Sequence, residues 1–101
     1  MNEEILKVQR KVPEWFRKRE QINSRVLIAY LKLEQSKQVI TPNLLEAECN
    51  EIKTFKSNYN QMKIISDKNH AKVFQENNGQ ITLWEPVAEF IISEFNNYQM
   101  R

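Results

Sequence analysis

The chain has 101 residues, of which 41% are hydrophobic and 10% aromatic, which is enough to bury the core of one small domain. It contains no apolar run as long as a membrane span, and its first residues are charged where a signal peptide has its apolar region. The single cysteine, Cys49, excludes an internal disulfide and a cysteine-pair metal site. These features predict a small cytoplasmic protein and favour a buried core thiol at Cys49.

Charge is distributed unevenly along the chain, although the formal net charge is only +2. Segment 7–25 contains seven basic and two acidic residues, and segment 53–72 contains five lysines and one aspartate. Segment 73–100 contains four glutamates and no basic residue. This polarity indicates a polyanionic partner, with an ordinary solvated charged surface as the alternative.

Residues 1–21 are predicted to form a basic arm and a short helix, and residues 22–101 the main domain. Pro13 should end or kink any helix that precedes it, so residues 1–12 are expected to form a loosely held arm. Pro13 also suits the first position of a short helix, whose Trp15 and Phe16 should pack on the main domain. The densest basic cluster of the chain follows, at Arg17, Lys18 and Arg19.

A core helix is predicted from Ile22 to between residues 35 and 37. Asn23 and Ser24 are good capping residues, and an apolar face follows over about three turns. The residues of that face are Val26, Leu27, Tyr30, Leu31 and Leu33.

Two further helices are predicted after this core helix. Thr41 should cap the first, which should run from about 42 to 49 with Pro42 at its first position. Asn50 can adopt the left-handed conformation of a helix-ending turn, and Thr54 can cap a second helix over 54–65. The predicted buried face of the second helix consists of Ile52, Phe55, Tyr59, Met62 and Ile65.

The pattern then changes to that of a hairpin. Residues 72–76 and 81–84 flank residues 77–80, and the pair Asn78 and Gly79 is the strongest short-range hairpin signal because both central residues need positive φ. Gly79 is the only glycine in the chain. The turn should place Phe74 opposite Leu83.

Pro86 can open a closing helix after the hairpin. Apolar residues form one helical stripe along it, namely Val87, Phe90, Ile91, Phe95 and Tyr98. Much of this stripe should cover the core. Because it is large for a chain of this length, it is also expected to form a homodimer with the same stripe of a second copy.

The order of short helix, turn, longer helix and hairpin resembles the winged helix-turn-helix family of nucleic-acid-binding domains. The resemblance implies an α+β fold with a three-helix core, a hairpin wing and a C-terminal helix. It also implies a short strand at Val39 and Ile40 that pairs with the hairpin, and a second helix that enters the major groove of duplex DNA.

Helix 54–65 has what duplex binding requires, which is short polar side chains for base edges and cations for phosphates. The predicted contacts within it and at its start are Lys53, Lys56, Ser57, Asn60, Gln61 and Lys63. Lys68 and Lys72 should contact phosphates at the base of the hairpin, because the only charge near the wing tip is acidic. The missing wing cations would be replaced by Arg17, Lys18 and Arg19. The alternative is that this face of the helix is simply solvated.

No enzymatic activity, cofactor or metal is expected from the titratable residues. Asp67 precedes His70 by three residues in the loop before the hairpin, which is typical of a hydrogen-bonded turn. Two functional hypotheses remain: a DNA-binding regulator or accessory domain, and a protein–protein adaptor that uses the closing apolar helix. Duplex binding should weaken steeply with salt, whereas an apolar protein contact should not.

Overall fold

The N-terminal segment forms one continuous helix, α1 (Glu3–Arg17), in the computed structural model, which describes residues 2–36 and 38–100. The side chain of Asn2 caps this helix, since its Oδ1 accepts a hydrogen bond from the Glu4 N–H at 2.7 Å. Pro13 lies inside the helix, and Val8 and Val12 on the buried side are fully shielded from solvent. The prediction of a loosely held arm and a separate short helix is therefore wrong.

Apolar burial explains why α1 continues through the proline. An interior proline costs a helix about 3 kcal/mol, because it removes one backbone hydrogen bond and crowds the preceding turn. Burial of one large apolar side chain contributes about 1.5 to 3 kcal/mol. Four such side chains lie on the buried face of α1, at Val8, Val12, Trp15 and Phe16, so the gain from burial exceeds the cost of the proline.

The central helix of the fold is α2 (Ile22–Gln35), and it contacts α1, α3 and α4. Its predicted boundaries and apolar face are confirmed, because all five predicted side chains are buried. The predicted caps are wrong. The N-cap is Gln21, whose side chain forms no cap hydrogen bond, and Ser24 is fully buried on the inner face of the helix.

The next helix, α3 (Pro42–Glu48), begins and ends close to its predicted positions. The Leu44 N–H donates to Thr41 Oγ1 at 3.1 Å, which confirms Thr41 as the cap. Cys49 follows the helix and is buried, as predicted, and burial raises the pKa of its thiol. Asn50 is not left-handed, because the turn is closed instead by a hydrogen bond from the Ile52 N–H to the Cys49 carbonyl at 2.9 Å.

The second short helix, α4 (Phe55–Gln61), is four residues shorter at its C-terminal end than the predicted 54–65. The Met62 carbonyl accepts hydrogen bonds from the N–H groups of Val73 and Phe74, at 2.9 and 3.0 Å. This carbonyl therefore does not bond to residue 66, and the helix ends. Ile65 is consequently 58% exposed, so its predicted burial is wrong.

The hairpin consists of β1 (Phe74–Asn77) and β2 (Gln80–Leu83), paired antiparallel with Phe74 opposite Leu83 as predicted. Asn78 and Gly79 both have positive φ, 53° and 75°, which confirms the predicted turn.

The strand predicted at Val39 and Ile40 does not form. One hydrogen bond remains, from the Ile81 N–H to the Ile40 carbonyl at 2.8 Å. Since Thr41 caps α3 immediately after Ile40, the segment is too short to form a ladder with β2.

Substitution of Gly79 by valine should lower the free energy of unfolding by about 1 to 3 kcal/mol. A Cβ at Gly79 would meet no atom within 4 Å, so the loss would come from forcing a branched residue into positive φ and not from a clash. Gln80→Ala on the exposed end of β2 is the control and should change the free energy by less than about 0.5 kcal/mol. Urea unfolding measures the free energy of unfolding of both variants. Equal, small losses of stability at the two positions would contradict the assigned turn.

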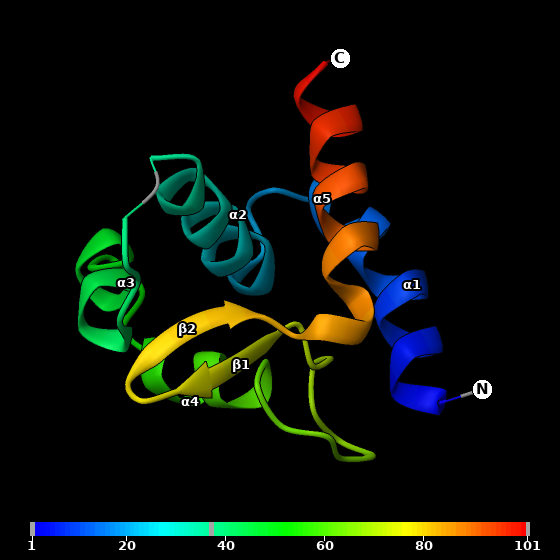
Figure 1. The fold of residues 1–101 in the computed structure, drawn as a ribbon, viewed down its shortest axis with the longest axis horizontal. Coiled ribbons are helices and arrows are strands. Elements are labelled where there is room, and N and C mark those ends of the chain that lie inside the picture. Colours follow the sequence, from blue (N-terminus) through cyan, green and yellow to red (C-terminus); the bar gives the residue numbers. More distant parts are fainter. Residues whose placement is uncertain (1, 37, 101) are drawn as a thin grey trace.

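The closing helix, α5 (Glu85–Gln99), lies beside α1, at the opposite side of the fold from α3 (Figure 1). The ring of Phe16 on α1 lies 5.7 Å from that of Phe95 and 5.5 Å from that of Tyr98. Three of the five stripe residues are buried within the chain, and Phe90 and Tyr98 are half-buried. α1 therefore covers much of the surface through which a homodimer was predicted, and the burial of this stripe does not support that dimer. The apolar contact surface of the predicted adaptor is covered for the same reason.

A buried polar cluster joins α1 to the loop between α4 and β1. Glu4 is 4% exposed, and its Oε2 accepts hydrogen bonds from Asn69 Nδ2 at 3.0 Å and the Lys72 N–H at 2.7 Å. The Lys7 ammonium lies 3.2 Å from Glu4 Oε1 and donates to Asn69 Oδ1. Burial alone would raise the pKa of Glu4, but these hydrogen bonds and the Lys7 charge together hold it below the ordinary value.

The described residues thus form a small α+β domain with five helices and one two-stranded antiparallel hairpin. One core unites side chains from all five helices and both strands. Within the described residues, no helix is both long and apolar enough to cross a membrane.

Candidate nucleic-acid interface

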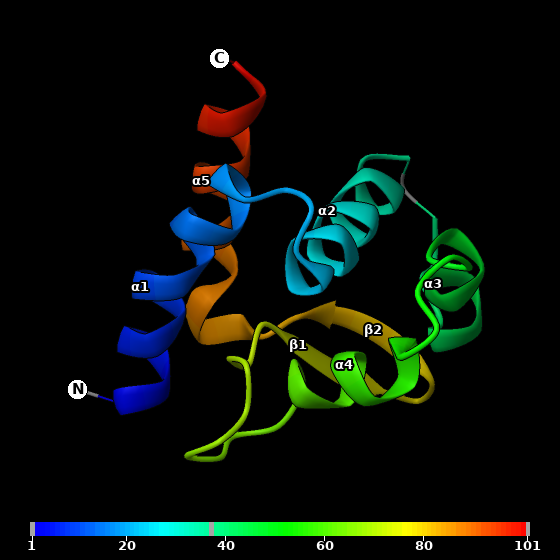
Figure 2. The ribbon, with the colours of Figure 1, turned by 180° about the vertical axis from the view of Figure 1, so that it is seen from behind.

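The helix α4 has one buried side and one polar side that faces solvent. Phe55 and Tyr59 point inward with stacked rings 5.7 Å apart, and both are buried. The helix lies next to the hairpin, in front of it in Figure 2. Its exposed side, together with the turn before it, presents Lys53, Lys56, Ser57 and Asn60. No acidic residue occurs in segment 52–66, so this face is neutral or positive throughout.

The predicted base-reading residues differ in how free their polar groups are. Asn60 is exposed, whereas Gln61 is half-buried. The Ser57 hydroxyl donates to the Thr54 carbonyl at 3.1 Å, so its proton is engaged within the helix. Asn60 is therefore the predicted base-reading residue best placed to donate and accept hydrogen bonds at an external base edge.

Lys63 is engaged in a network that connects α4 to the hairpin. Glu76 Oε1 accepts hydrogen bonds from the Tyr59 hydroxyl at 2.6 Å and the Lys63 ammonium at 3.2 Å. These two hydrogen bonds hold the pKa of Glu76 below its usual range, and burial raises the pKa of Tyr59. The acidic charge of the hairpin is thus paired with Lys63 at the surface of the molecule.

The position of Glu76 in β1 indicates this network already in the amino-acid sequence. The prediction that Lys63 contacts a phosphate did not consider it. Alternation along β1 places Glu76 on the same face as Phe74, two residues earlier, and that face points toward α4. Glu76 is itself exposed, but on this side of the hairpin its carboxylate meets the Tyr59 hydroxyl and the Lys63 ammonium.

Lys72 is also engaged within the fold. Its ammonium donates to the Lys63 carbonyl at 2.7 Å and lies 5.5 Å from the centre of the Trp84 ring. Burial lowers the pKa of Lys72. The lysines of this region that are exposed and form no ion pair within the described part of the chain are Lys53, Lys56 and Lys68.

The structure separates the basic cluster at residues 17–19 from α4. These residues lie at the C-terminal end of α1, which is away from α4 in Figure 1. The Lys18 ammonium forms an ion pair with Glu14 at 2.8 Å, and the Arg19 guanidinium lies 6.0 Å from the centre of the Tyr98 ring. The cluster therefore lies on a different surface from α4.

The loop before the hairpin forms the predicted hydrogen-bonded turn, in which the Asn69 N–H donates to the Ser66 carbonyl at 3.4 Å. Asp67 is exposed, whereas His70 Nε2 lies 3.3 Å from Asn58 Nδ2 on α4. Ser66 organises the turn, since its Oγ accepts from the Lys68 N–H at 3.3 Å. Burial and the charge of Lys11 lower the pKa of His70 below its ordinary value. No group of three or more possible metal ligands occurs among the described residues.

Comparison of the chain with models of protein families, with curated proteins and with solved structures found no match.

Proposed function

We propose that this chain is a small winged-helix protein that binds duplex DNA through α4 and acts by occupancy, as a transcriptional regulator or an accessory domain of a DNA-processing system. The main support is the exposed face of α4, where Lys53, Lys56 and Asn60 project from a segment without acidic residues. Cations for phosphates and an amide for base edges are the two components that sequence-selective duplex binding requires.

The arrangement around α4 also agrees with this proposal. Two short helices are followed by a hairpin, and the hydrogen bond between Ile81 and Ile40 lies where the family has its short third strand. With seven residues, α4 is about 10 Å long and of a width that the major groove accepts. The wing would contribute neutral amides at Asn77 and Asn78, because the charge of Glu76 is already paired with that of Lys63.

Replacing Lys56 with alanine should weaken binding to every duplex sequence and flatten the salt dependence by about one unit, as expected for loss of one phosphate contact. Lys18→Ala is the matched control, since it removes an exposed lysine beyond the C-terminal end of α1, away from α4. Fluorescence anisotropy at several salt concentrations measures both variants. Equal effects of the two substitutions would show that α4 has no special role.

Replacing Asn60 with alanine should cost about 1 to 3 kcal/mol of binding free energy on the preferred sequence, with little change on other duplexes. The control is Asn97→Ala, which removes an exposed amide from α5. Selection of a preferred site from a random duplex pool would precede the titrations. A uniform loss across all sequences would contradict base reading by Asn60.

A further inference from the structure

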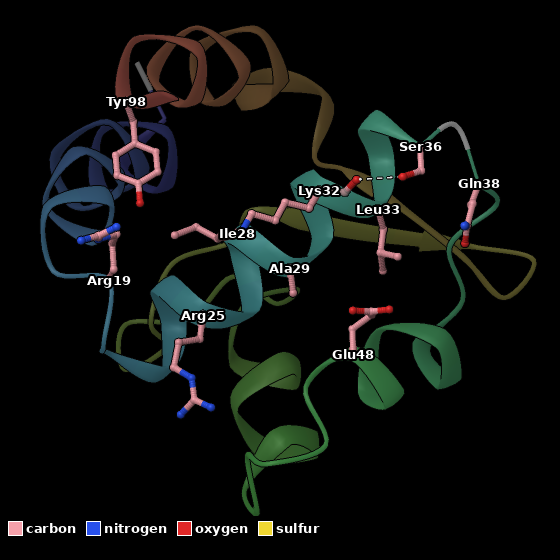
Figure 3. A pocket seen from close by; sticks show the side chains of 10 residues that line it. All are labelled: Arg19, Arg25, Ile28, Ala29, Lys32, Leu33, Ser36, Gln38, Glu48 and Tyr98. Atoms are coloured by element: carbon pink, nitrogen blue, oxygen red, sulfur yellow. Dashed lines mark hydrogen bonds between the residues drawn. The ribbon is translucent and has the colours of Figure 1, made fainter. Parts of the chain in front are cut away.

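An open groove of about 620 Å³ runs along the outer face of α2, apart from α4 (Figure 3). Arg25, Ile28 and Lys32 line it from α2, Arg19 and Tyr98 lie on one side, and Glu48 of α3 lies on the other. Ile28 is half-buried against the core and contributes apolar surface to the floor. The groove thus combines an apolar floor with a basic rim.

The basic groups of the groove are only weakly compensated within the chain. Arg25 lies 3.8 Å from Glu51, but both side chains are exposed, and exposed pairs contribute little. Lys32 and Arg19 form no ion pair with any residue in the described ranges. Three cations face a single carboxylate, Glu48, so the groove favours an acidic occupant.

The chain itself presents a surface of matching chemistry on α5. Glu85, Glu89, Ile92 and Asn96 are exposed and recur at helical spacing, so they form one stripe. This stripe is distinct from the apolar stripe under α1, and Ile92 within it is 44% exposed. In the part of the chain that the structure describes, neither Glu85 nor Glu89 forms an ion pair. An acidic helix face with one exposed isoleucine complements a basic groove with an isoleucine on its floor.

We propose that the groove on α2 binds the acidic stripe of α5 from a second copy of the chain. With the two helices antiparallel and Ile92 of one copy against Ile28 of the other, Glu89 comes opposite Lys32. Glu89 lies three residues before Ile92, and Lys32 lies four residues after Ile28. Each charged residue is therefore about one helical turn from its isoleucine, and in an antiparallel pair both lie in the same direction along the contact. The two surfaces differ, so the association is head-to-tail. It does not depend on DNA binding.

Charge exchange between the two surfaces tests this proposal. At low salt, the weight-average molar mass of the wild-type protein, measured by sedimentation equilibrium, should increase with protein concentration. Added salt should lower it again. Lys32→Glu and Glu89→Lys should each weaken the association at least about tenfold, because like charges then face each other. An equimolar mixture of the two variants should recover it, since the exchanged charges again form opposite pairs.

Matched controls separate this contact from general charge effects. Lys68→Glu and Glu34→Lys make the same charge changes at exposed positions outside the groove and the stripe, and both should associate like wild type. A wild-type protein that stays monomeric at high concentration and low salt would overturn the proposal. So would loss of association in Lys32→Glu alone, which would indicate that the groove binds another acidic segment, or failure of the mixture to recover association.

Discussion

Replacing Phe74 with alanine should lower the free energy of unfolding by about 3 to 5 kcal/mol, the range expected when a fully buried aromatic side chain is truncated. Phe74 is fully buried at the first position of β1, with its ring 5.1 Å from that of Tyr30 and 5.7 Å from that of Tyr59. The cavity left by alanine would lie where α2, α4 and the hairpin meet, so none of the three can close it without moving another.

Phe90→Ala on α5 is the matched control for Phe74→Ala. Phe90 packs against the core but is only half-buried, so truncation removes less buried surface and solvent can fill the space. Urea unfolding should therefore show a clearly smaller loss for this variant. Equal losses at the two positions would mean that Phe74 does not occupy the junction between these elements.

Replacing Glu4 with glutamine should lower the free energy of unfolding by about 2 to 3 kcal/mol. The amide nitrogen of glutamine would be a donor among groups that already donate, namely Asn69 Nδ2 and the Lys72 N–H, and the charge opposite Lys7 would be lost. Glu3→Gln is the control, because it removes the neighbouring but exposed carboxylate. Its effect should stay below about 0.5 kcal/mol.

The stabilisation by Glu4 should also depend on pH. The pKa of Glu4 is lowered in the folded chain from the ordinary glutamate value of 4.5. At pH values between the folded and unfolded pKa of Glu4, the native state therefore binds fewer protons than the unfolded state. The stabilisation is complete above pH 4.5 and is lost as pH falls through the folded pKa. The difference in stability between wild type and Glu4→Gln should narrow on acidification. A difference independent of pH would show that the carboxylate charge does not hold α1 in place.

Features of the fold that depend on local sequence could be predicted. Asn78 and Gly79 specify the turn and hence the pairing of Phe74 with Leu83, whatever the rest of the chain does. Thr41 and Pro42 likewise set the start of α3 through a cap and a fixed φ.

Features that depend on contacts distant in sequence could not be predicted in the same way. Pro13 indicates a helix break until α5 is known to cover the face on which Val8 and Val12 lie. The end of α4 depends on hydrogen bonds from Val73 and Phe74, eleven and twelve residues beyond Met62. Local propensity contains no information on either contact.

The candidate interface also has one feature that local sequence predicts and one that it does not. The exposure of Lys56 and Asn60 follows from helical spacing, because Phe55 and Tyr59 fix which side of α4 is buried. Alternation along β1 predicts that Glu76 lies on the side of Phe74, but the ion pair of Lys63 with Glu76 also depends on how the hairpin packs on α4, which local sequence does not specify.

Titration of a mixed-sequence duplex with the wild-type protein at several salt concentrations tests the proposed function most directly. If Lys53, Lys56 and Lys68 each neutralise one phosphate, the logarithm of the binding constant should fall with the logarithm of salt concentration with a slope of about −2.7, at about −0.9 per contact. Absence of duplex binding at low salt, or binding that salt leaves unchanged, would contradict DNA recognition by α4.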